Sequence, residues 1–377
     1  MHHTSPILDQ PFMPIFARLE NKTDIRTISL EELKDFFEKN GQQAFRAKQV
    51  YEWLWAKSAN SFAAMSNLSK ETRALLEEHF TFRTLSVDSS QVSRDRTIKN
   101  AFKLYDGNIV EGVLIPTETR MTACISSQVG CSLTCKFCAT GKLERLRNLE
   151  AYEMYDQVVF LNNQAKEKYN IPLSNIVYMG MGEPLLNYKN VLASIGRITS
   201  PAPLGLGMSP QRITVSTAGI SKMIKKLGDD NVKFNLALSL HAANDEKRNK
   251  IMPINEDNSL DSLAEALSYF EEKTGTRVTF EYIIFKDFND TVKDAQELVD
   301  FCKKVKAKVN IIEYNPIDGG EFQQTLASRL KVFVSHLEKN NIIVNVRRSR
   351  GKDIDAACGQ LANKNKAGLE KRILKST

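Results

Sequence analysis

The 377-residue sequence has few cysteines and no long apolar run. Its six cysteines are too few for a secreted scaffold built on disulfides. No segment approaches the roughly 18 consecutive apolar residues that a membrane helix needs. The first ten residues also lack the hydrophobic stretch of a secretion signal. We therefore expect a reduced, cytoplasmic protein with no membrane partner.

The sequence also lacks internal repeats and low-complexity tracts. Hydrophobic residues make up 42% of the chain, which is enough for a packed core. The length favours one large domain with a smaller one beside it. Lys and Arg number 52 against 45 Asp and Glu, so the net charge is +7. This excess indicates a polyanionic partner, although many enzymes are equally basic.

From residue 121 onward the sequence alternates between strand-like and helix-like segments. Helical patterns lie between the strands, for example at 151–168, 262–273 and 291–306. Such βα units in series predict an α/β fold, an open (β/α)6 partial barrel. A seventh apolar segment at 342–347 fits an added edge strand. The six strands of the barrel are expected at 122–126, 175–179, 212–215, 234–240, 278–284 and 309–314.

The residues before and after this barrel have other patterns. We expect a helical N-terminal accessory domain over residues 1–90, with helices after Ser29, at 45–55 and near 69–80. It is either a packing module or an RNA-contacting domain. The remaining predicted divisions are a β-hairpin and linker at 91–120, the barrel at 121–350, and a C-terminal loop with a basic tail at 351–377.

Three cysteines stand close together at Cys131, Cys135 and Cys138. A [4Fe–4S] cluster held by three cysteines keeps one iron without a protein ligand, and this iron can bind a small molecule and pass it an electron. Zinc is the alternative, with Cys124 as a fourth ligand. It fits poorly, because zinc sites usually use two separated Cys-x2-Cys pairs. The spacing favours the cluster and leaves zinc open.

Other polar residues follow the predicted strands. In βα barrels, functional groups lie just after the C-terminal ends of strands. Glu183 can accept a hydrogen bond from an amino group, and its neighbour Gly182 lets backbone approach a ligand. Each of these residues alone is a weak indication of a binding site. Their expected position at one rim of the barrel strengthens the indication. The candidates are Gly182, Glu183, Ser216, Ser239, Leu240, His241 and Asn315.

Cys358 lies among glycines and alanines, after the basic run Arg347, Arg348 and Arg350. Small neighbours indicate a loop that brings the sulfur close to something bulky. Cys302, which follows Phe301 in an apolar helix pattern, fits a buried structural cysteine instead. The arginines are candidates for phosphate contact or are simply solvated.

These motifs together resemble the RlmN/Cfr family of radical S-adenosylmethionine enzymes, which methylate an adenine carbon in RNA. The resemblance covers nearly the whole chain. It rests on the three-cysteine motif and on four phrases. These are Cys-Ile-Ser-Ser-Gln-Val-Gly-Cys at 124–131, Gly-Met-Gly-Glu-Pro at 180–184, Ser-Leu-His at 239–241, and Asp-Ile-Asp-Ala-Ala-Cys-Gly-Gln-Leu at 353–361. One departure is Leu143-Glu144-Arg145, where the family usually has another sequence.

The resemblance implies roles for the candidate residues. Cys131, Cys135 and Cys138 would hold the [4Fe–4S] cluster, and the rim residues would bind S-adenosylmethionine, used twice per turnover. Cys358 would carry the methyl group, Glu111 would accept the ring proton, and Cys124 would resolve the RNA adduct, leaving a disulfide. An external electron donor and a disulfide reductant would be needed.

The resemblance also implies the substrates. They would be adenosine 2503 of 23S rRNA and adenosine 37 of tRNA, methylated at C2. Pro184 favours C2 over the alternative, C8, because the C8 branch tends to carry alanine after Gly-Glu. A zinc-stabilised RNA-binding module without catalysis is the competing class of function. Colour separates the two classes, since a reconstituted cluster protein is brown and a zinc protein is colourless.

Overall fold

The computed structural model describes residues 22–363, and these divide into two compact units. The smaller unit contains residues up to Thr84 together with Ala202–Leu204, and the larger contains the rest. The predicted boundary at residue 90 falls inside strand β3 (Ser86–Val92), which pairs with the sheet of the larger unit. The boundary therefore lies at Thr84. The predicted basic tail lies mostly outside the described residues.

The smaller unit is helical, as predicted. Ser29 caps its first helix in a capping box with Glu32, where each side chain bonds the other residue's backbone N–H. A short parallel pair joins β1 (Thr23–Asp24) to β2 (Phe80–Thr81), so the two ends of the unit meet. Its helices are α2 (Leu30–Lys39), α3 (Arg46–Trp55) and α4 (Lys70–His79).

The larger unit is built on one open sheet of ten strands, ordered β14-β13-β12-β11-β10-β9-β6-β5-β4-β3. From β14 to β6 all neighbours are parallel, and from β6 to β3 they are antiparallel. The predicted open partial barrel is confirmed, with the hairpin β4–β5 extending it. The strands are β4 (Ile98–Lys103), β5 (Ile109–Pro116), β6 (Met121–Cys124), β9 (Asn175–Tyr178), β10 (Ile213–Thr217), β11 (Asn235–Ser239), β12 (Val278–Ile284), β13 (Ala307–Glu313) and β14 (Val344–Arg347).

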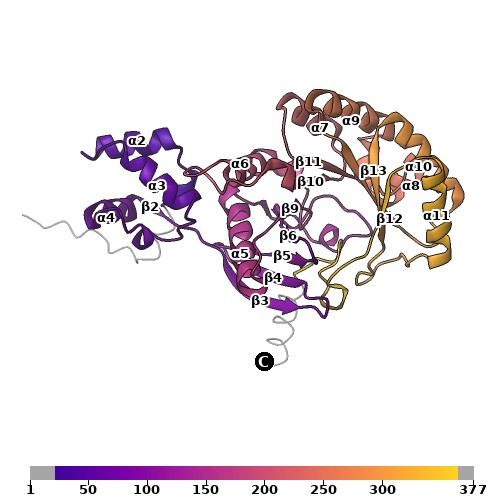
Figure 1. The fold of residues 1–377 in the computed structure, drawn as a ribbon, viewed down its shortest axis with the longest axis horizontal. Helices are drawn as coiled ribbons and strands as arrows, with labels where there is room; N and C mark the ends of the chain where they lie inside the picture. Colours follow the sequence, from indigo (N-terminus) through magenta and orange to yellow (C-terminus); the bar gives the residue numbers. More distant parts are fainter. Residues whose placement is uncertain (1–21, 364–377) are drawn as a thin grey trace, which may run out of the picture. The chain divides into compact units, whose positions relative to one another are not determined.

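Helices of the larger unit follow the parallel strands and cover the outer side of the sheet (Figure 1). Among the described residues, no helix is both long and apolar enough to cross a membrane. A separate small sheet pairs β7 (Gln128–Val129) with β8 (Arg147–Asn148). The helices are α5 (Ala151–Tyr169), α6 (Tyr188–Thr199), α7 (Ser221–Asp229), α8 (Asp245–Ile251), α9 (Leu260–Thr274), α10 (Val292–Lys304) and α11 (Ala327–Lys339).

Candidate active site

A cavity of about 240 Å³ opens at the C-terminal ends of the parallel strands. The order of the strands explains this, because loops after parallel strands all emerge at the same edge of the sheet. The cavity collects residues that lie more than 200 positions apart in the chain. Ten of the thirteen predicted site residues line it: Cys124, Cys131, Cys135, Cys138, Gly182, Glu183, Ser216, Ser239, His241 and Cys358.

Three predicted residues do not line this cavity within the part of the chain that the structure describes. Leu240 is fully buried, and its carbonyl accepts a hydrogen bond from Arg248. Asn315 is buried behind the C-terminal loop, where its amide donates to the Cys358 carbonyl at 3.2 Å. Glu111 is also buried, and its position is described below.

The three clustered cysteines lie in the loop after β6 and are half-buried. Burial raises the pKa of all three thiols, that of Cys131 to about 11. Thiols in such surroundings ionise only when a metal or another cation compensates the charge. The described residues contain no group of three His, Cys, Asp or Glu side chains that could hold a single metal ion. In an iron–sulfur cube each cysteine binds a separate corner of the cluster.

The loop that departs from the family pattern is held against the cysteine loop by backbone contacts. The Cys131 N–H donates to the Leu143 carbonyl at 3.4 Å. A Cβ on Gly130, whose φ is +75°, would lie 1.9 Å from the Glu144 carbonyl oxygen. These two contacts involve the backbone of residues 143 and 144.

Gly182 and Glu183 follow β9 and form a tight cradle. A Cβ on Gly182 would lie 2.4 Å from the Gln128 Cβ, and its φ is +95°, so only glycine fits. Burial raises the pKa of the Glu183 carboxyl. Its two oxygens accept backbone N–H bonds from Leu185 at 3.0 Å and Ala218 at 2.7 Å. These bonds orient the carboxylate and leave it lone pairs for a further donor.

His241 enters the cavity from the loop after β11 in a left-handed conformation, with φ +56°. Burial lowers its pKa to about 3, so the imidazole is neutral. Its Nδ1 accepts a hydrogen bond from the Ile283 N–H at 3.0 Å, which leaves the proton on Nε2. The ring therefore presents a donor. Nearby, the hydroxyls of Ser216 and Ser239 lie 3.3 Å apart on adjacent strands.

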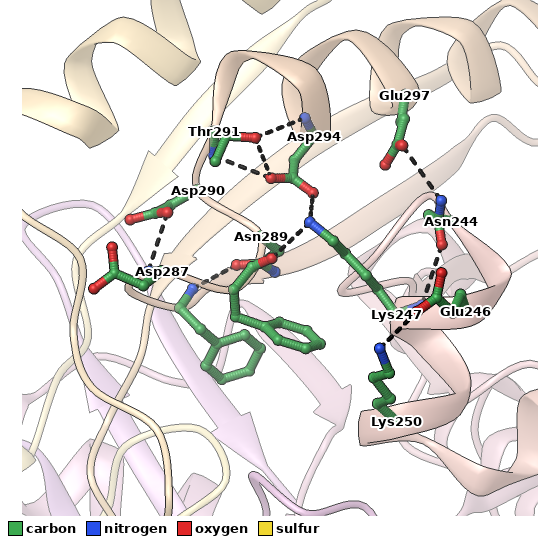
Figure 2. A network of polar contacts seen from close by, with 12 residues as sticks. Asn244, Glu246, Lys247, Lys250, Asp287, Asn289, Asp290, Thr291, Asp294 and Glu297 are labelled. Atoms are coloured by element: carbon green, nitrogen blue, oxygen red, sulfur yellow. Dashed lines mark hydrogen bonds and ion pairs between the residues drawn. The ribbon is translucent and has the colours of Figure 1, made fainter.

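A buried network fixes the backbone of His241. The Asn289 amide donates to the His241 carbonyl at 2.7 Å and to the Ile283 carbonyl at 2.8 Å. Figure 2 shows the surrounding contacts, in which the Lys247 ammonium pairs with Asp294 at the start of α10. The loops after β11 and β12 are therefore held together, and the strained histidine is positioned by its neighbours.

Cys358 and Cys124 both face the cavity, although they come from opposite ends of the unit. Cys124 ends β6, whereas Cys358 lies in the C-terminal loop. Burial raises the pKa of the Cys124 thiol to about 12, and the charge of Cys358 adds to this rise. The Cys358 surface is accessible from the cavity, but surrounding protein desolvates the sulfur and raises its pKa to about 11.

The arginine run takes part in this site. Arg347 ends β14 and lines the cavity, where its guanidinium pairs with Glu281 at 3.0 Å. Its charge lowers the pKa of both Cys124 and Cys358. Arg350 instead donates to the Asp95 carbonyl at 3.3 Å. Sequence reasoning missed Glu281, although a carboxylate inside the apolar strand β12 was a usable signal.

The C-terminal loop is held by several polar contacts. The Thr140 hydroxyl donates to the Leu361 carbonyl at 2.7 Å, and the Ala139 N–H donates to the Gly359 carbonyl at 2.7 Å. These bonds tie the Cys358 loop to the residues that follow Cys138. The loop therefore places Cys358 beside the three cysteines.

The residues present fit a bound cluster and S-adenosylmethionine. The donor set is three thiols at one rim, and the glycine cradle brings backbone to the cavity. The buried Asn315 Oδ1 has no hydrogen-bond partner within the described residues, although Asn315 does not line the cavity. These features agree with a cofactor that carries amino and hydroxyl groups.

Comparison with known proteins identifies the family. Residues 23–82 match the ribosomal RNA large subunit methyltransferase N-terminal domain, and residues 125–302 match the radical SAM superfamily. The chain is 62% identical to a probable dual-specificity RNA methyltransferase RlmN of Cytophaga hutchinsonii, over 91% of this chain and 93% of that one. A Bacillus licheniformis relative with the same description is 41% identical, over 92% and 96%.

A solved structure shows the same fold. The crystal structure of a radical SAM methyltransferase from Sphaerobacter thermophilus superposes with a TM-score of 0.84 at 36% identity, covering 90% of this chain and 99% of that chain. Radical SAM enzymes use a [4Fe–4S] cluster and S-adenosylmethionine, so these are the cofactors of this chain. The chain belongs to the RlmN family of dual-specificity radical SAM RNA methyltransferases.

Proposed function

We propose that this chain methylates C2 of adenine, at adenosine 2503 of 23S rRNA and adenosine 37 of tRNA, in the cytoplasm. The proposal depends on one observation, that Cys124 and Cys358 both line the cavity that the three clustered cysteines also line. A ring carbon between two nitrogens cannot attack a methyl sulfonium as an amine can. The ring carbon must instead react with a carbon radical. A cysteine sulfur can carry the methyl carbon on which this radical forms.

In this proposal Cys131, Cys135 and Cys138 hold the cluster, while Glu183, His241 and the two rim serines bind S-adenosylmethionine. When bound, these cofactors supply the methyl group and the radical that activates it. An external electron donor provides the electron. Burial desolvates Cys131 and Glu183, which strengthens charge interactions around the reacting atoms.

The chain's own groups then carry the methyl and release the product. Cys358 holds the carbon that joins the ring, so RNA and protein are covalently linked for a time. Glu111 accepts the ring proton. The Cys124 thiolate attacks the Cys358 sulfur and a Cys124–Cys358 disulfide forms. The carbon–sulfur bond breaks with its electron pair on the methylene carbon, which takes up a proton and becomes the methyl group of the product. A thiol reductant restores both cysteines for the next turnover.

The position of the methyl group is the sharpest test. Purified chain, with its cluster reconstituted, is incubated with rRNA and tRNA transcripts, and the digested nucleosides are compared with 2-methyladenosine and 8-methyladenosine standards by mass spectrometry. The expected product from both RNAs is 2-methyladenosine. An 8-methyl product would favour the C8 alternative and show that Pro184 does not report the position.

A further inference from the structure

Arg248 is a buried cation without a carboxylate partner. Its side chain has no exposed surface, and its guanidinium donates only to neutral oxygens. Within the described residues, no acidic side chain forms an ion pair with it. Burying an unpaired charge is costly unless another charge compensates it. The acceptors are the carbonyls of Leu240 at 3.0 Å, Ser239 at 3.2 Å and Ala218 at 2.5 Å, and the Asn255 Oδ1 at 2.5 Å.

The helix that carries Arg248 contacts the cysteine loop, and its guanidinium bonds the carbonyls of Ala218 and Ser239, two residues that line the cavity. Arg248 belongs to α8, and the carbonyl of Ile251 at the end of this helix accepts the Lys136 N–H at 3.0 Å. Lys136 stands between Cys135 and Cys138. Cys135 and Cys138 also pack against the apolar cluster that contains Ile251. The same apolar cluster therefore contacts both the end of α8 and the cysteine loop.

The positive charge of Arg248 complements the negative charge that a cluster on the cysteine loop would carry. Three bound thiolates make the cluster site anionic, and reduction adds one more negative charge. In surroundings of low polarity such charges interact strongly with a nearby cation. Burial lowers the pKa of Arg248 to about 10, while the charges of Cys135 and, less strongly, Asp245 raise it. The Arg248 charge in turn lowers the pKa of Cys135.

We propose that Arg248 is the buried counter-charge of the [4Fe–4S] cluster and makes the cluster easier to reduce. The electron comes from an external one-electron donor, and no bond to Arg248 forms or breaks. Its hydrogen bonds to carbonyls hold the cation in place, so its charge stays available to the cluster. The inference rests on the three proposed cysteine ligands and is independent of which adenine carbon is methylated.

Potentiometry of the cluster-loaded chain tests this directly. Anaerobically reconstituted wild type, Arg248→Met, Arg248→Lys and Lys250→Gln are titrated with dithionite, and the reduced cluster is followed by electron paramagnetic resonance. Lys250 is the matched control, because it lies on the same helix with its side chain 59% exposed. Iron content and far-ultraviolet circular dichroism are measured on each sample.

Arg248→Met is expected to lower the midpoint potential. Unit charges on the order of 10 Å apart in a protein interior change an equilibrium constant roughly tenfold, which equals about 59 mV for one electron. Arg248→Lys keeps the charge and is expected to stay near the wild-type potential despite losing hydrogen bonds. Lys250→Gln should leave the potential unchanged, since solvent screens an exposed charge.

Two results would overturn the proposal. One is an iron-loaded Arg248→Met with the wild-type potential, and the other is a Lys variant shifted as far as the Met variant. If Arg248→Met fails to load iron, Arg248→Gln decides, because glutamine keeps hydrogen-bond donors for the buried carbonyls and removes the charge. The proposal expects the iron-loaded Gln variant to have a lower midpoint potential than wild type, and a wild-type potential would contradict it. A folded wild type without iron would instead overturn the cysteine ligands.

Discussion

The Lys99 ammonium lies 3.3 Å from the Glu111 carboxylate, and both side chains are almost completely buried. The other carboxylate oxygen accepts the N–H groups of Ala362 at 2.8 Å and Asn363 at 3.2 Å. Glu111, which lies in β5, therefore bonds β5 to the loop that contains Cys358. For Glu111 to accept a ring proton, as we propose, its carboxylate must be released from this loop during the reaction.

We predict that Lys99→Met destabilises the chain. Removing one partner leaves the Glu111 charge buried and unpaired, at a cost of about 3 kcal/mol in the free energy of unfolding. Urea denaturation measures the loss. The double variant with Glu111→Gln should be less destabilised than the sum of the two single variants. Additive effects would show that the two side chains are not coupled.

A second prediction concerns pH and His241. The pKa of its imidazole is about 3 in the folded chain and about 6.5 in the unfolded chain. The unfolded state therefore binds more protons, and stability should fall as the pH drops below about 6.5, by about 2 kcal/mol between pH 6.5 and pH 5. Denaturation midpoints across this range check it. His241→Gln should flatten the fall, and an unchanged slope would contradict the low pKa.

A third prediction concerns Gly182. Gly182→Ala would place a methyl group 2.4 Å from the Gln128 Cβ at a φ of +95°, so the cradle must shift. We expect lower thermal stability and weaker binding of S-adenosylmethionine, measured by calorimetry. Gly196→Ala in α6 is the control, because nothing lies within 4 Å of its Cβ position. It should gain about 1 kcal/mol of stability. Equal effects of the two changes would mean that the cradle is not tight.

A fourth prediction concerns the cluster ligands. Cys135→Ala should lose the cluster, whereas Cys302→Ala should keep it, because Cys302 is buried in α10 and does not line the cavity. Iron analysis and visible absorbance of anaerobically prepared protein measure this. Full iron in Cys135→Ala would rule out the three-cysteine ligand set.

The regular parts of the fold could be predicted from the sequence because they depend on local patterns. The strand β12 at Val278–Ile284 has the predicted bounds, since an apolar segment between two amphipathic helices leaves few alternatives. The cysteine loop and the glycine after β9 could be placed at one rim for a similar reason, as loops after parallel strands share one edge.

Long-range polar partners could not be predicted in this way. Arg347 was a candidate for phosphate contact, yet it pairs with Glu281, 66 residues away. Strand β3 was missed because its alternation is mostly polar and exposed. The site of Glu111 depends on Lys99 and on loop residues about 250 positions later. No local pattern reports such contacts, because they arise only after the sheet has formed.

The last prediction concerns Cys124 and Cys358, whose proposed roles are sequential. Cys358→Ala should keep the cluster but form no covalent link to RNA, because no sulfur carries the methyl group. Cys124→Ala should form the link and fail to break it, so protein remains attached to RNA on a denaturing gel. The double variant should show no attached species. Normal turnover by Cys124→Ala would refute its resolving role.

The pH dependence of adduct release separates a resolving thiol from a structural one. Burial raises the pKa of Cys124, so only a small fraction is thiolate at neutral pH. Since the thiolate is the attacking species, release in the wild type should speed up with pH, roughly tenfold per unit below the pKa. Arg347→Gln removes the nearby cation that lowers this pKa and should slow release at each pH. A release rate that is independent of both pH and Arg347 would show that attack by Cys124 does not limit this step.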